Sequence, residues 1–170
     1  MRKILLSSAL ILSLATSAFA AKMVGKWAVA LDGSKTAAFL VASKSKEIFN
    51  EGTLGIRCNG KKTDVILRTP GVYLYNPGPW KHEDKGPITI RYSVDGGSLE
   101  NIRATPPGSG GGEAVFLANG ASFIKKLIDS KQIVVQFTHL AKNKELIFEI
   151  EGLREAISPY ISMCPGVVLP

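Results

Sequence analysis

The sequence predicts a mainly β protein of the α+β class, folded as an antiparallel β-sandwich or partly open barrel with two short helices towards the C-terminus. Three observations lead to this fold class. Short runs of alternating apolar and polar residues recur along the chain, as half-buried strands require. Turn signals rich in Gly, Asn and Asp separate them about every 8 to 12 residues, which is typical of sandwiches and barrels. Residues 121–164 then read as a helix, two strands, a second helix and a cysteine.

The first 20 residues have the pattern of a cleaved signal peptide. Arg2 and Lys3 precede an apolar run from Ile4 to Ala15, and Ala18-Phe19-Ala20 supplies a small-x-small cleavage site. The apolar run is about 12 residues long, well short of the roughly 20 that cross a bilayer. We therefore expect cleavage after this site and a periplasmic mature chain, residues 21–170, that folds as a single domain.

The charge of the chain restricts its partners. The formal charge of +7 falls to +5 once Arg2 and Lys3 are removed. Such an excess favours anionic partners, among which cell-wall polymers are a candidate. The basic residues are scattered, however, and they form no cluster interleaved with aromatic residues, so nucleic acid is not an expected partner. No motif in the sequence indicates a cofactor.

Four strands are expected in the first half of the mature chain. In the first, at 26–32, apolar residues alternate with small ones, whereas the second, at 36–43, is apolar on both faces and indicates an interior strand. Runs at 53–58 and 63–69 flank Asn59-Gly60, the strongest short hairpin signal. In the last of these strands Val65 and Leu67 alternate with Asp64, Ile66 and Arg68.

The middle of the chain is less regular. Prolines and glycines rule out a regular element in the loop 76–87, and period two returns at 88–94. In the region 98–113 a candidate return strand, 98–104, is followed by a glycine-rich segment of flexible composition. That segment lacks the Gly-Lys-Ser/Thr ending of a phosphate-binding loop, so we interpret it as a linker or hairpin loop before a short strand at 114–118.

The C-terminal unit has the clearest patterning. Its first helix carries Phe123, Ile124, Leu127 and Ile128 on one side. Strands at 132–140 and 145–150 follow, joined by the polar tetrapeptide 141–144, which has the length of a four-residue hairpin loop. The second helix ends near Cys164 and is marked by apolar residues at helical spacing: Leu153, Ala156, Ile157, Tyr160 and Ile161.

The two cysteines, Cys58 and Cys164, both belong to the mature part. In an exported protein an even count favours a disulfide. Two free thiols and half of a metal site are the alternatives. A metal site needs further ligands, and the two histidines, His82 and His139, stand in different sequence settings. We therefore predict a disulfide and no metal site.

The remaining candidate chemistry is limited to one loop. Trp80, Lys81 and His82 lie in the loop 76–87, where an exposed tryptophan would serve as an interface anchor. The alternative is that Trp80 folds back and caps the open end of the sandwich. No Gly-x-Ser-x-Gly turn is present, and the cysteines are better used in a disulfide. We therefore expect a binding protein and not an enzyme, with no catalytic residues.

One succession of residues extends over nearly the whole mature chain: Trp27, Ile56-Arg57-Cys58, Arg91 with Asp95-Gly96-Gly97, Phe123 to Leu127, the hairpin 132–150, and residues 151–157 before Cys164. This succession resembles the VasI/TagO family, exported proteins associated with bacterial type VI secretion.

The resemblance implies a VasI-like fold and a periplasmic accessory protein that acts by binding other envelope proteins, including a secretion apparatus. The alternative function is that of an inhibitor or exclusion factor, encoded by a phage or by the host, that acts on a cell-envelope target. An envelope hydrolase with a site hidden in a loop is a third reading.

Overall fold

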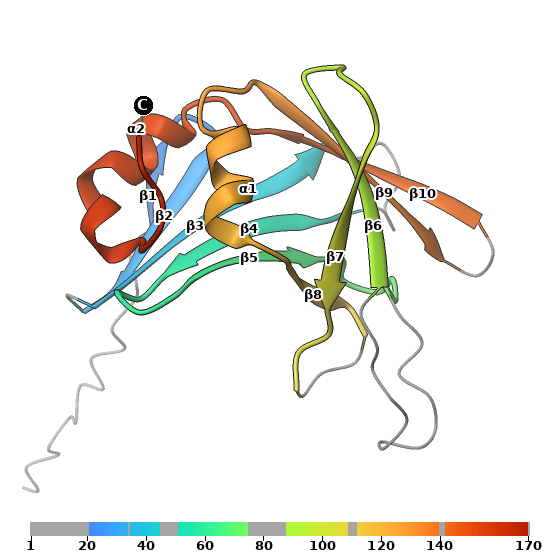
Figure 1. Cartoon of the computed structure of the whole chain (residues 1–170), viewed down its shortest axis with the longest axis horizontal. Coiled ribbons are helices and arrows are strands. Elements are labelled where there is room, and N and C mark those ends of the chain that lie inside the picture. The colour runs from blue at the N-terminus through green and yellow to red at the C-terminus, as the bar shows by residue number, and fades with distance from the viewer. Residues whose placement is uncertain are drawn as a thin grey trace, which may run out of the picture.

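The computed structural model describes residues 21–33, 35–44, 51–74, 88–108, 112–139 and 142–169. These residues form a mainly β structure with two α-helices and a 3-10 helix (Figure 1). The strands are β1 (Lys22–Val24), β2 (Trp27–Asp32), β3 (Thr36–Lys44), β4 (Thr53–Cys58), β5 (Thr63–Arg68), β6 (Ile88–Val94), β7 (Glu100–Thr105), β8 (Ala114–Leu117), β9 (Gln132–His139) and β10 (Lys142–Glu149). The helices are α1 (Gly120–Leu127), α2 (Leu153–Ile157) and the 3-10 helix η1 (Ser158–Met163).

Eight antiparallel strands close into a barrel in the order β3-β10-β9-β6-β7-β8-β5-β4, and β4 pairs with β3 to complete the ring. The predicted sandwich or partly open barrel is therefore wrong in its finer form, although the mainly β class with two short helices is confirmed. The length of β3 makes closure feasible. Its residues 37–42 pair with β4, while Ser43 and Lys44 pair with β10 at the other edge.

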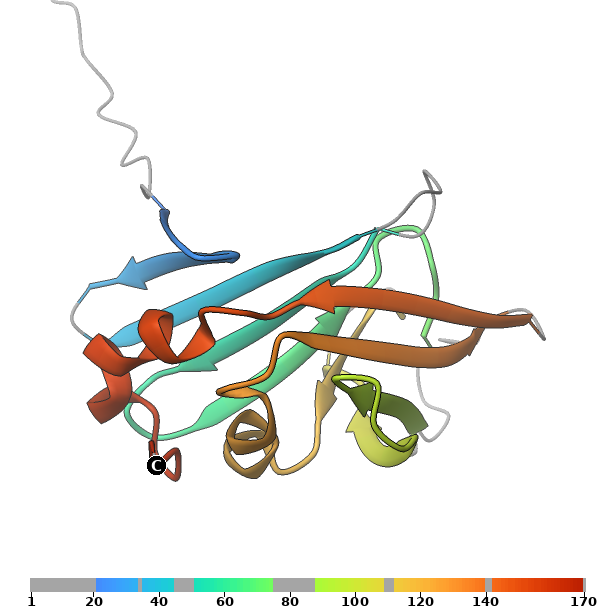
Figure 2. The ribbon, with the colours of Figure 1, turned by 90° about the horizontal axis from the view of Figure 1, so that it is seen from above.

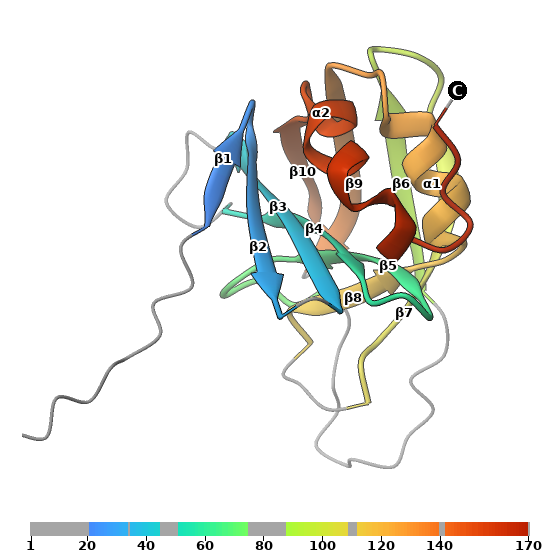
Figure 3. The same cartoon turned by 90° about the vertical axis from the view of Figure 1, so that its left-hand side faces the viewer.

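Strands β1 and β2 extend the sheet beyond the barrel (Figure 3). Strand β2 pairs with residues 36–40 of β3, next to the place where β10 takes over the same edge. At this junction the indole Nε1 of Trp27 donates a buried hydrogen bond of 3.0 Å to the carbonyl oxygen of Ile150. The short strand β1 was not predicted from the sequence.

Alternating side chains fill the barrel interior. Val65 and Leu67 are fully buried, as their spacing predicted, and so are Trp27 and Phe39. Leu31, in contrast, is 39% exposed, because β2 runs past the end of the core. The expected return strand is confirmed as β7, and the Asn-Gly hairpin as β4–β5.

The C-terminal unit has the predicted order of helix, hairpin and helix. The four apolar residues of the first helix are buried, as are Leu153, Ala156 and Ile157 of α2. The predicted loop 141–144 is wrong, because residues 142–144 belong to β10 and Lys142 pairs with His139. No helix in the described ranges is long and apolar enough to cross a membrane.

The predicted disulfide between Cys58 and Cys164 is present. It joins the end of β4 to the residue after η1, so that α2 and η1 lie against one end of the barrel (Figures 1 and 2). Two hydrogen bonds reinforce this attachment. The amide of Gly60 donates to the carbonyl of Met163 at 2.8 Å, and the hydroxyl of Thr63 donates to the carbonyl of Pro165 at 3.0 Å.

Candidate functional site

A row of apolar residues crosses the outer face of five neighbouring strands. In the strand register, Leu40 lies directly opposite Ala28 on β2 and Gly55 on β4. Gly55 in turn lies opposite Ile66 of β5, which lies opposite Phe116 of β8. We call these five residues the outer strip. Sheet faces in contact with water normally carry polar side chains, so this continuous apolar row needs an explanation.

The side chains of the outer strip project little from the sheet and are partly exposed to solvent. Leu40 is 43% exposed, and Ile66 and Phe116 are half-buried. The side chain of Leu40 lies over Gly55, where a Cβ atom would be 3.0 Å from Leu40 Cδ2. The glycine thereby lets the leucine lie flat between two strands. The half-buried Ala38 widens the apolar surface on one side.

A cluster of charges borders the outer strip on one side. The carboxylate of Asp64 is only 4% exposed and forms ion pairs with Arg57 at 2.6 Å and with Lys62 at 2.7 Å. Burial opposes ionisation of Asp64, but the hydrogen bonds from Lys62 and Arg57 outweigh it and hold the pKa of the carboxyl below its usual value. Both cations also lie over the ring of Phe116, at 5.6 and 5.9 Å from its centre. The cluster therefore has an excess of one positive charge.

A further cation borders the other side of the outer strip. Arg68 lies opposite Thr53 of β4 and Ala114 of β8, and it is exposed. Among the described residues Arg68 has no ion-pair partner. The apolar row thus runs between two positively charged borders.

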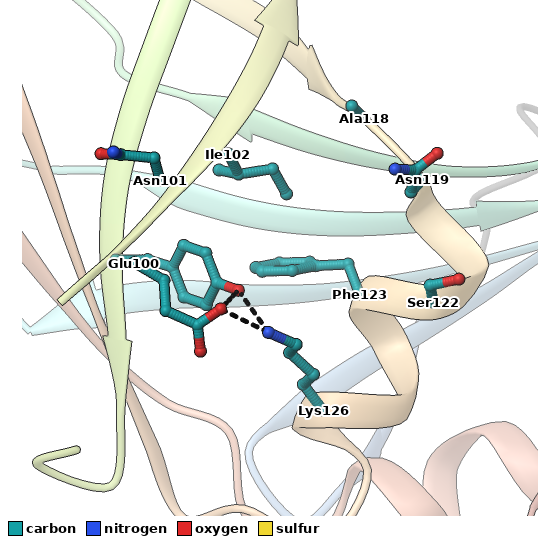
Figure 4. Close-up of a pocket in the computed structure, with 9 residues that line it drawn as sticks. Glu100, Asn101, Ile102, Ala118, Asn119, Ser122, Phe123 and Lys126 are labelled. Atoms are coloured by element: carbon teal, nitrogen blue, oxygen red, sulfur yellow. Dashed lines mark hydrogen bonds and ion pairs between the residues drawn. The ribbon is translucent and has the colours of Figure 1, made fainter. Parts of the chain in front are cut away.

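A pocket of about 200 Å³ lies between the β6–β7 hairpin and α1 (Figure 4). On one wall Lys126 Nζ donates to Glu100 and, at 3.0 Å, to the hydroxyl of Tyr92, which itself donates to Glu100 at 2.9 Å. The hydrogen bond from Lys126 lowers the pKa of Glu100, while burial raises the pKa of Tyr92. The edge of the Phe123 ring meets Tyr92 at a centroid distance of 5.0 Å.

The polar groups of Tyr92, Glu100 and Lys126 form hydrogen bonds with one another. Glu100 accepts from both neighbours, and Lys126 reaches from the helix to the hairpin. A tyrosine whose pKa is raised stays protonated at neutral pH, so its hydroxyl is not available as a general base. We therefore interpret the trio as a clamp that fastens α1 to the β6–β7 hairpin, and the outer strip as the stronger candidate site.

The residues singled out from the sequence have different outcomes. Cys58 and Cys164 are joined. The candidate interaction loop with Trp80, Lys81 and His82 lies outside the described residues. His139 ends β9, and its side chain is not among those the structure describes. Within the described ranges no group of three or more His, Cys, Asp or Glu is placed to hold a metal ion.

Sequence reasoning missed the outer strip. The available signal was the second predicted strand, which is apolar on both faces. That pattern predicts an interior strand, and β3 is indeed paired along both edges. Its outer face nevertheless leaves Leu40 exposed.

Comparisons with known proteins support the fold. No family model and no curated protein matches the chain. A solved structure, invasion associated protein B from Bartonella henselae, is similar with a TM-score of 0.57 and 13% sequence identity, over 84% of this chain and 96% of that one. At this level of identity the likeness shows a shared barrel fold and nothing about activity.

Proposed function

We propose that this chain is an exported accessory protein of the periplasm that acts by binding another envelope protein, with the outer strip as its contact surface. The observation that carries the proposal is the apolar row itself. Scattered exposed apolar residues are ordinary, whereas contiguous ones mark interaction sites. The five residues of the outer strip are contiguous because each lies directly opposite the next on the neighbouring strand.

Export is supported by two independent features. The first 20 residues have the composition of a signal peptide, and the disulfide fits an oxidising compartment. The resemblance to the VasI/TagO family adds a setting, namely an accessory role in type VI secretion. Under this proposal the partner is a component of that apparatus.

The chemistry of the outer strip favours a protein over a cell-wall polymer as partner. Leu40, Ile66 and Phe116 present aliphatic and aromatic surface, with few hydrogen-bonding groups between them. A polysaccharide requires many hydroxyl contacts, whereas the core of a protein interface is apolar with charges at its rim. The borders of the strip, with Arg57 on one side and Arg68 on the other, match that second arrangement.

Site-specific photo-crosslinking tests the proposal. A photoreactive benzoylphenylalanine replaces Leu40 in the chain expressed in its own bacterium, and Arg91 in a matched control. Arg91 is exposed on β6, a strand that carries no residue of the outer strip and lies two strands from β8 and three from β3 around the barrel. We expect one discrete adduct from position 40 and none from position 91, and mass spectrometry then identifies the partner.

A second variant checks that the adduct depends on the outer strip. Ile66 lies opposite Gly55, which itself lies opposite Leu40. The variant Ile66→Glu should abolish the adduct at position 40 and leave the far-ultraviolet circular dichroism spectrum unchanged. Equal labelling from positions 40 and 91, or no adduct at position 40, would reject the outer strip as a contact surface. An adduct with a protein outside the secretion apparatus would reject the secretion role alone.

A further inference from the structure

We infer that the partner presents an acidic segment, with an apolar centre that covers the outer strip and carboxylates on both sides of it. This inference rests on the proposed function and adds the chemistry of the partner. It follows from where the cations stand relative to the apolar row.

The two borders lie on opposite sides of the outer strip. Arg57 follows Gly55 by two positions on β4, and Arg68 follows Ile66 by two positions on β5. Because these strands are antiparallel, the two steps run in opposite directions. Two residues of a strand span about 6.7 Å. The Cα atoms of Arg57 and Arg68 therefore lie roughly 7 Å from the row along their strands, one on each side, so that one partner segment centred on the strip can reach both side chains.

The charge that this surface presents to solvent is positive. The side chains of Arg57 and Lys62 are 47% and 70% exposed, whereas Asp64, which pairs with both, is 4% exposed. The buried carboxylate neutralises one of the two cations, so the exposed rim at Arg57 and Lys62 keeps a net charge of +1. Arg68 adds a second net positive charge on the far side. Complementary charges around an apolar centre are the usual way in which an interface gains specificity.

An acidic protein fits this surface better than an anionic membrane. Interfacial binding inserts an apolar face about 5 to 10 Å into the headgroup region, which requires side chains that project. In the outer strip Leu40 lies flat over Gly55, and Ile66 and Phe116 are half-buried. A flush surface of this kind suits a partner that packs against it.

Charge reversal tests the inference. The test compares Arg68→Glu with the matched reversal Arg91→Glu on β6, each in the chain that carries the photoreactive residue at position 40. Arg68 is preferred over Arg57 because loss of Arg57 would leave Asp64 buried with a single partner. Adduct yield is measured in osmotic-shock extracts at low and high salt. We expect Arg68→Glu to lower the yield about tenfold, since like charges at an interface repel, and Arg91→Glu to leave it unchanged.

Each outcome has a distinct meaning. A parent adduct that weakens with salt and with Arg68→Glu supports an acidic partner. An adduct indifferent to both overturns the acidic partner while the proposed function stands, and no parent adduct at position 40 overturns both. In a parallel arm the purified mature chain is sedimented with phosphatidylglycerol and with phosphatidylcholine vesicles. If the chain binds the phosphatidylglycerol vesicles but not the phosphatidylcholine vesicles, and Arg68→Glu abolishes that binding, the partner is an anionic lipid surface and the acidic protein partner is rejected.

Discussion

Breaking the disulfide should lower the free energy of unfolding by about 4 to 5 kcal/mol. Cys58 and Cys164 are separated by 106 residues, and the chain-entropy model assigns about this much to a closed loop of that length. The effect arises mainly in the denatured state, which gains freedom when the loop opens. For a domain of this size the same change corresponds to a melting temperature lower by about 10 to 15 °C.

The folded state should survive the loss of the cross-link. The hydrogen bonds from Gly60 to Met163 and from Thr63 to Pro165 still hold the C-terminal segment against the β4–β5 loop. The rings of Phe39 and Tyr160 also stay in contact, with centres 6.0 Å apart. We therefore expect the reduced protein to be folded and to unfold cooperatively, with a lower free energy of unfolding than the oxidised protein.

Urea unfolding of three samples measures the effect. These are the oxidised mature chain, the same chain after reduction, and the double variant Cys58→Ala, Cys164→Ala. The reduced chain should lose most of the stability that the double variant loses, because the cross-link and not the packing of the sulfur atoms carries the effect. A reduced chain that unfolds at the same urea concentration as the oxidised chain would refute the reasoning.

Three further predictions concern single contacts. The pKa of Asp64 in the folded protein lies below the value of 3.8 expected for the unfolded chain. The ionised carboxylate therefore contributes its full stabilisation above pH 3.8, and this contribution is lost as the pH falls through the folded pKa. Between pH 7 and about pH 3 the urea midpoint of Asp64→Asn should accordingly fall less than that of the parent. Trp27→Phe leaves the buried carbonyl of Ile150 without its donor and should cost about 1 to 3 kcal/mol in urea unfolding. Gly120→Ala places a Cβ atom 2.6 Å from the carbonyl oxygen of Thr63 and should lower the melting temperature, at a cost of about 1 to 3 kcal/mol.

The local elements were predictable because their periodicity reports which face is buried. Val65 and Leu67 point into the core at strand spacing, and Phe123 and Ile124 do so at helical spacing. Barrel closure has no such local signal. It depends on pairings between segments far apart in the sequence, as when β3 meets β10 through Ser43 and Phe148. Periodicity identifies a face but not the neighbouring strand.

Two local errors have physical causes. Residues 142–144 have the composition of a loop, but the hairpin that they extend runs beyond the core (Figure 2), so polar side chains are tolerated in a strand there. The three residues of β1 are too few to show a period. This strand exists because Gly25, at a φ of +57°, allows the chain to turn back onto β2.

The apolar outer face of β3 shows what sequence periodicity leaves undecided. Burial against the chain's own elements and burial against a partner use the same transfer free energy, so both leave the same apolar pattern in the sequence. Only the structure separates them, because it shows Leu40 to be 43% exposed in the monomer. One exposed leucine would be ordinary, but Leu40 continues in register through Gly55 to Ile66 and Phe116. The outer face of a strand that the sequence predicts to be interior is therefore the observation on which the proposed contact surface rests.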